Sequence, residues 1–236
     1  VINAPIVNTN VLIWNNNDDD KNPKGYSQDI IDTKDQSYSW YKKFLWGQVH
    51  SDSIIGFWYD FTWAKDQASV TQKALPLGQA YLNFMKDVPL NNGKYQDAAA
   101  ETSDTKLRAW GQKEIIDGKG DRAHLWIDNK PYNWQNIIKS QAGTAQLTSP
   151  LTGTVTLLEM KEGWYKVEWW DTTAGSVSST ENKKIESDGK LVLSVNNLVS
   201  DTAVKAYPLD LIKPAVTIKS PSDGAVVTTN SVTVSY

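Results

Sequence analysis

The spacing of apolar residues changes at about residue 90, and this change limits the possible folds more than any other feature of the chain. Beyond it, short segments alternate apolar and polar residues and are separated by Gly, Asn and Asp; GTVTLLEM and GWYKVEWWDT are two of them. Alternation with a period of two is typical of strands that bury one face. We therefore predict an antiparallel β-sandwich over residues 104–212.

The part before residue 90 has a different order of elements. Residues 1–14 and 54–64 indicate strands, and the run IIGFWYDFTWA in the second is almost continuously apolar, as in a strand covered on both faces. Residues 35–50 and 71–88 carry apolar side chains at helical spacing. The order strand, helix, strand, helix predicts a parallel α/β layer over residues 1–92.

Both predicted helices carry signals for their first turn. Asp35 or Ser37 is suited to cap the first helix. In the second helix Pro76 fits best in the first turn, so we expect that helix to begin near Leu75.

Three further segments lie around the sandwich. Residues 91–105 are polar and resemble a linker, and residues 132–141 indicate a short helix or a turn. Residues 213–236 include a Ser-Pro turn that feeds a β-run, as residues 149–153 do earlier in the chain. We interpret residues 213–236 as the start of an immunoglobulin-like domain.

Composition narrows the class of protein. Among the 236 residues are 11 Trp and 10 Tyr but only 4 Phe, a bias that suits surfaces with an apolar face and a polar rim, such as sugar-binding clefts, although large sandwiches also bury Trp. The absence of cysteine excludes disulfides and thiolate metal sites. A net charge of −3 argues against nucleic acid, and no run is apolar enough to span a membrane. Both ends look cut, so we expect a segment of a longer protein.

Two groups of motifs resemble a known family. PIVNTNVLIW, a helix and then IIGFWYDFTWA look like the last two β-α units of a retaining (β/α)8 glycoside hydrolase, a TIM barrel. RAWGQ, AHLWIDNKPYNW and EGWYKVEWWDT resemble the β-sandwich often appended to such barrels. The resemblance implies α/β plus all-β architecture in a secreted, multidomain protein of the cell surface or exterior, without a cofactor.

The resemblance also places the catalytic position. The seventh strand of such barrels often ends in a Glu nucleophile, and the matching residue here is Asn10. Retaining hydrolysis needs two carboxyl groups about 5 Å apart, and an amide does not replace one of them. The acid/base belongs to the fourth strand, which no segment here supplies. We therefore expect a chain that is inactive on its own, whether or not its parent is an enzyme.

The resemblance further implies a cleft for polysaccharide. Alternation puts Trp58 and Asp60 on the same side of their strand, so Asp60 arrives at the mouth of the barrel if Trp58 faces its axis. Trp14 reaches the same rim, Trp58 would form the floor, and Trp63 a wall. The alternative is ordinary packing of a core strand, with Asp60 as a helix cap.

The predicted α/β layer is incomplete by itself. A closed barrel takes about 250 residues, and two parallel strands alone leave unpaired backbone groups. We expect the partner to be the remainder of the barrel, from the missing N-terminal part or from another chain; a reduced layer packed on the sandwich is a third possibility. A different class of function also fits: a structural cell-surface or filament-forming protein on a degenerate glycosidase scaffold. A carbohydrate-binding module is a weaker alternative.

Other residues carry weaker signals. Residues 15–20 are rich in oxygen ligands but lack EF-hand spacing, which favours a solvated loop over calcium. His50 and His124 are far apart and favour structural roles over zinc. Trp169 and Trp170 in EWWD should point to opposite faces of a strand, one into the core and the other toward a domain interface.

Overall fold

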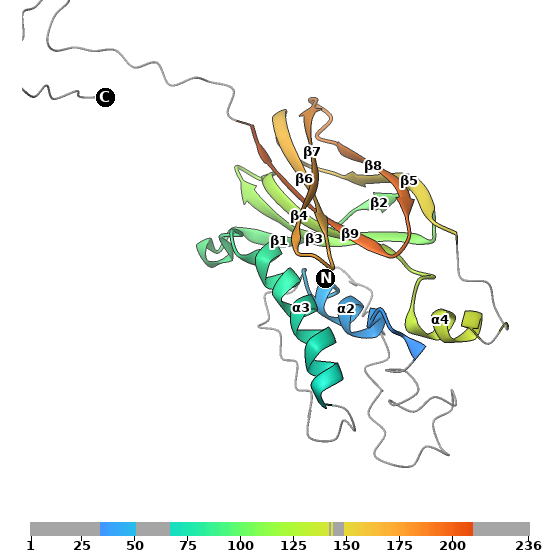
Figure 1. The fold of residues 1–236 in the computed structure, drawn as a ribbon. Coiled ribbons are helices and arrows are strands. Elements are labelled where there is room, and N and C mark those ends of the chain that lie inside the picture. Colours follow the sequence, from blue (N-terminus) through green and yellow to red (C-terminus); the bar gives the residue numbers. More distant parts are fainter. Residues whose placement is uncertain (1–33, 51–66, 142, 144–148, 210–236) are drawn as a thin grey trace, which may run out of the picture.

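The computed structural model describes residues 34–50, 67–141, 143 and 149–209 (Figure 1). The helices are α2 (Ser39–Trp46), α3 (Gln67–Met85) and α4 (Trp134–Gln141), with a short 3-10 turn, η3 (Leu90–Asn92). The strands are β1 (Tyr95–Ala99), β2 (Glu101–Thr102), β3 (Leu107–Ile116), β4 (Lys119–Asn129), β5 (Leu151–Leu157), β6 (Gly163–Asp171), β7 (Ser176–Ile185), β8 (Leu191–Leu198) and β9 (Asp201–Pro208).

The strands form two antiparallel sheets that face each other. The larger sheet has the order β1-β3-β4-β9-β6-β7, and the smaller has the order β2-β5-β8. The described part of the chain is thus a β-rich domain with few helices, as the alternating segments predict. The hairpin between β3 and β4 turns at Asp117-Gly118, where both residues have positive φ (53° and 77°), as a two-residue turn requires.

The space between the two sheets is filled mainly by aliphatic side chains. Leu193 and Val195 of the smaller sheet pack against Leu125, Val167 and Val204 of the larger sheet. All five are buried, because alternate residues of each strand point into this space. We call this face of the larger sheet the inner face.

The opposite face of the larger sheet is also covered, by α2 and α3 (Figure 1). Trp110, Trp126 and Ala203 of the sheet pack here against aromatic and aliphatic residues of the two helices, among them Trp46 and Phe84. The rings of Trp110 and Trp126 meet edge to face, with centroids 5.1 Å apart. We call this the outer face; because it too is covered, β4 is buried along most of its length.

Helix α2 confirms the first predicted helix, although it is shorter than residues 35–50. Its cap position is Tyr38, with φ 51° and ψ 38°, and not Asp35 or Ser37. The Asp35 carboxylate still accepts a hydrogen bond from the backbone N–H of Trp40, at 3.2 Å, so it satisfies a donor of the first turn.

Helix α3 confirms the second predicted helix, but the predicted start near Leu75 is wrong. The helix begins at Gln67, so Pro76 lies in its interior. Proline removes the N–H that would bind the carbonyl of Gln72. Gln72 and Pro76 are both exposed, so water can satisfy that carbonyl, and the helix continues.

The predicted linker is also wrong in part. Residues 91–105 contain β1 and β2, which pair with β3 and β5. Polar composition is misleading here because both are edge strands with mostly exposed side chains. Residues 132–141 do contain a helix, α4.

Several predicted elements lie outside the described residues. These are the strands of residues 1–14 and 54–64 and the immunoglobulin-like start at residues 213–236. The parallel α/β layer therefore stays a prediction, of which only the two helices are seen. Within the described ranges, no helix is both long and apolar enough to cross a bilayer.

Candidate functional site

The residues predicted for the sugar cleft, Trp14, Trp58, Asp60 and Trp63, lie outside the described residues, as does Asn10. The same holds for the polar loop of residues 15–20. Their roles stay predictions.

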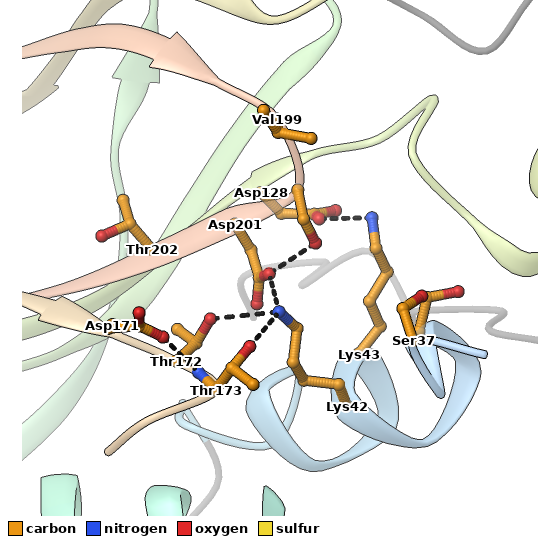
Figure 2. Close-up of polar contacts among 12 residues, drawn as sticks. Ser37, Lys42, Lys43, Asp128, Asp171, Thr172, Thr173, Val199, Asp201 and Thr202 are labelled. Atoms are coloured by element: carbon orange, nitrogen blue, oxygen red, sulfur yellow. Dashed lines mark hydrogen bonds and ion pairs between the residues drawn. The ribbon is translucent and has the colours of Figure 1, made fainter. Parts of the chain in front are cut away.

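The described residues contain a different candidate, a group of mostly buried charged side chains between α2 and the outer face. It consists of Lys42 and Lys43 from α2, Arg108 from β3, Asp128 from β4 and Asp201 from β9. We call these five residues the charge cluster. Figure 2 shows both lysine side chains reaching from the helix toward the two carboxylates.

Each carboxylate of the charge cluster binds a cation at short range. Lys42 Nζ lies 2.6 Å from Asp201 Oδ1, and Lys43 Nζ lies 2.5 Å from Asp128 Oδ1. The second oxygen of Asp128 accepts a hydrogen bond from Arg108 Nε, at 2.6 Å. The side chains of both aspartates are 0% exposed. The cluster is therefore a network of three cations and two anions, buried except for Arg108, whose side chain is 24% exposed.

Neutral donors and acceptors complete the network. The Trp126 indole N–H donates to Asp201 Oδ2 at 2.8 Å, and the Ser200 hydroxyl donates to Asp201 Oδ1 at 2.6 Å. Lys43 Nζ also donates to the carbonyl of Asn129, at 2.8 Å. Buried charges are tolerated when their remaining hydrogen-bonding capacity is satisfied in this way.

The register of the sheet explains why so many cations are needed. Asp128 and Asp201 are direct cross-strand partners on β4 and β9. Like charges directly opposite each other destabilise a sheet. The cations of α2 offset this repulsion, so the two strands favour α2 in its observed position.

The electrostatics follow from burial and pairing. Burial by itself would raise the pKa of Asp201, but the Lys42 ammonium, together with the Ser200 and Trp126 donors, holds this pKa below its ordinary value. Burial lowers the pKa of Lys43, and the Asp128 carboxylate opposes that effect. Asp201 is therefore held as a carboxylate.

The arrangement does not fit acid/base catalysis. Two carboxyl groups on neighbouring strands resemble the pair that a glycosidase needs. Here both are fully buried and each is bound to a cation, so no sugar can reach either one. Their chemistry is suited to holding a helix on a sheet.

The turn between β6 and β7 contacts both α2 and α3. Lys42 Nζ donates to the hydroxyls of Thr172, at 3.3 Å, and Thr173, at 3.2 Å (Figure 2). The turn also approaches α3, because a Cβ added to Gly175 would lie 2.4 Å from the Cα of Ala80. Gly175 has φ +65°. The approach and the dihedral both require glycine here.

The sequence holds a signal for the charge cluster, although none of its residues is among the predicted site residues. In WYKKFLW, the lysines lie within one turn of Tyr41, Leu45 and Trp46, all of which are buried. A helix that is apolar on most of its surface must bury its charged residues too, and those then need partners. The partners lie on strands far away in the chain, so the sequence does not identify them.

The residues singled out in the sandwich have structural roles. His124 is 2% exposed, and its Nε2 lies 3.2 Å from the carbonyl of Val49. Trp169 packs against the apolar residues of the inner face and Trp170 against those of the outer face, which confirms the prediction that the two rings point to opposite faces. Over the ranges that the structure covers, no group of three or more acidic or histidine side chains is arranged to hold a metal ion.

Similarity to known proteins is weak. No protein-family model and no curated protein matches the sequence. The crystal structure of the GH39 enzyme from Xanthomonas axonopodis pv. citri is similar in part, with 11% identity, 45% of this chain and 26% of that chain covered, and a TM-score of 0.29. The chain thus spans about a quarter of the length of that enzyme, and so low a TM-score carries no argument about activity.

Proposed function

We propose that this chain is the C-terminal segment of a secreted or cell-surface glycoside-hydrolase-like protein that acts on or binds polysaccharide. In this proposal the sandwich is a rigid base, and α2 and α3 belong to a barrel layer docked on it. The observation that carries the proposal is the charge cluster. Its ion pairs join α2 to strands β4 and β9, and Arg108 of β3 binds the same Asp128 carboxylate, so α2 is held in one orientation on the sheet.

The exposed side of α3 supports the proposal that the helical layer continues beyond α2 and α3. Leu75 and Leu82 are 62% and 59% exposed and lie two turns apart on one stripe. The opposite side of the helix is buried on the sheet through Leu77, Tyr81 and Phe84. A helix with apolar residues on both sides is suited to a position between two layers. We propose that the remainder of the barrel covers this stripe.

The catalytic part of the proposal rests on the resemblance of the first strand to the seventh strand of a retaining barrel. With an amide at Asn10, the chain binds sugar without hydrolysing it. Trp58 and Asp60 supply stacking and hydrogen bonding in the cleft, with Trp14 and Trp63 at its rim. No part of this function calls for a metal or an organic cofactor.

A panel of soluble polysaccharides tests the proposal. We expect the chain to bind at least one of them, and Trp58→Ala to weaken that binding by about tenfold or more, since aromatic stacking supplies much of the contact. Trp164→Ala is the matched control, because Trp164 is a half-exposed ring of the sandwich. The cleft assignment is wrong if Trp58→Ala binds as well as the parent chain.

Two further measurements accompany the panel. Release of reducing ends should stay at background, and measurable hydrolysis would show that Asn10 is not at the nucleophile position. Electron microscopy should show single particles. Filaments would favour the alternative function, a structural surface protein.

A further inference from the structure

We propose that β7 is an interface between two copies of this chain, which pair edge to edge about a twofold axis at Asn182. The inference concerns assembly and goes beyond the proposed function, since it needs neither a sugar nor the cleft. It rests on the position of β7 at the edge of the larger sheet, on the direction of its backbone groups and on the order of its charges.

Strand β7 is the last strand of the larger sheet among the residues that the structure describes. It is ten residues long, contains no proline and has mostly exposed side chains, whereas β1 at the opposite edge has five residues. Proteins usually shorten, cover or interrupt such an edge, because its backbone groups can bind another strand. The edge at β7 is therefore long enough to pair with a further strand.

The backbone of β7 directs its hydrogen-bonding groups outward at alternate residues. The carbonyl of Trp164 in β6 accepts a hydrogen bond from the N–H of Leu209, 2.7 Å away and just past β9, so Trp164 faces β9. The next residue, Tyr165, faces β7 and is paired there with Lys183. Lys183 therefore faces β6, and the N–H and C=O of its neighbour Asn182 point away from β6, to the outside of the sheet.

Two opposite charges flank Asn182 on the inner face. Lys183 Nζ lies 3.1 Å from Glu181 Oε2, and the Trp169 indole N–H donates to Glu181 Oε1 at 3.0 Å. The side chains of Lys183 and Glu181 are 29% and 35% exposed, so a second strand at this edge can reach both.

The charges favour one register for an antiparallel pair of identical strands. With Asn182 opposite its own copy, Glu181 of each chain lies opposite Lys183 of the other, which makes two ion pairs across the interface. A centre at Glu181 or at Lys183 would set like charges against each other. A centre at Thr180 would give no ion pair and would cross the irregularity in the β6–β7 ladder.

The same register uses the outward backbone groups. Asn182 exchanges two hydrogen bonds with its copy, and Thr180 and Lys184 exchange two on either side, about six in all. A twofold contact of this kind occupies the same edge in both copies and closes, so it gives a dimer and no filament. The dimer is therefore compatible with the single particles expected in electron microscopy.

Sedimentation equilibrium of the chain over a range of concentrations tests the proposal, and we expect a reversible dimer. Asn182→Pro removes the outward N–H but leaves the bonds to β6, so it should weaken the dimer about tenfold or more. Asn182→Ala keeps the N–H and is the matched control, with little expected change. A parent chain that stays monomeric, or equal loss in the two variants, would overturn the proposal.

Charge reversal tests the register. Glu181→Lys sets lysines against lysines, and Lys183→Glu sets glutamates against glutamates, so each variant alone should dimerise about tenfold more weakly than the parent chain. A mixture of the two variants should dimerise again, because each edge then meets the opposite charges. Lys190→Glu, at an exposed lysine outside β7, should leave the dimer unchanged. The proposal fails if variants with the circular dichroism of the parent chain stay monomeric in the mixture.

Discussion

The two faces of the larger sheet are built from the same strands but pack differently. The inner face meets the smaller sheet through aliphatic residues such as Leu125, Val167 and Leu193. The outer face meets two helices through large aromatic rings and the charge cluster. Neighbouring residues of one strand serve the two faces, as Trp126 and Ile127 do on β4.

The difference shows that aliphatic packing and buried ion pairs contribute to the fold in different ways. Aliphatic packing depends on volume and tolerates many combinations of side chains. Buried ion pairs lose hydration, so they stabilise only in one geometry, and breaking one is costly. We conclude that the inner face stabilises the sandwich, whereas the outer face determines where the helices dock.

The largest expected effect is on the outer face. Asp128→Ala leaves Lys43 and Arg108 without their carboxylate, which should lower the free energy of unfolding by about 3–5 kcal/mol. Amides of α2 should lose protection from hydrogen exchange before those of β5 and β8. Asp188→Ala is the control, because its pair with Lys190 is exposed and worth about 1 kcal/mol or less. If the two variants lose the same stability, the charge cluster is no anchor.

The next effect is on the inner face. Leu193 is fully buried there, so Leu193→Ala should cost about 3 kcal/mol, within the usual range for such a cavity. Urea denaturation measures the loss. Here amides of both sheets and of α2 should lose protection together, since the helices need the sandwich to dock. Loss confined to one sheet would contradict this order of dependence.

Acid should act on the outer face first. The folded pKa of His124 is about 4, below the ordinary value of 6.5, so the unfolded chain takes up the proton first as pH falls. Stability should therefore decrease from about pH 6.5 to pH 4, by up to roughly 3 kcal/mol. The apolar cluster between the two sheets should not add to this acid dependence. Burial raises the pKa of its Tyr165 to about 12, so that side chain stays protonated throughout the acid range.

Urea titrations at several pH values measure this slope, and His124→Gln is the matched control because glutamine does not titrate. The difference in stability between the two proteins should shrink as pH falls through that range. A constant difference would mean that His124 takes up its proton equally in both states. Asp201, whose pKa is lowered in the fold, should add a further loss only at more acidic pH.

The smallest effect concerns the turn that touches both helices. Gly175→Ala should cost about 1–3 kcal/mol, because the new Cβ meets α3 and the residue has φ +65°. Gly93→Ala separates the two causes, since Gly93 has φ +71° but nothing within 4 Å of its added Cβ. We expect a larger loss at Gly175, measured by urea denaturation. Equal losses would mean that the backbone conformation, and not the contact with α3, requires glycine.

Much of the local structure can be predicted from spacing alone. Alternation identifies strands such as β6 and β8, because a half-buried strand exposes every second side chain to water. The same rule correctly separates Trp169 and Trp170, which pack on opposite faces. Helical spacing finds α2 and α3, whereas the proline signal misplaces the start of α3, since an exposed proline can lie inside a helix where water satisfies the freed carbonyl.

The sequence by itself therefore determined that segments such as α2, β6 and β8 are helix or strand and which side of each is apolar, because these depend on neighbours in the chain, whereas it missed β1 and β2. Only the tertiary structure decided that the larger sheet is covered on both faces, that Asp128 and Asp201 lie side by side, and that Lys42 and Lys43 are their partners. Lys43 and Asp128 are 85 positions apart. Contacts over such separations depend on strand order and register, which local spacing does not encode.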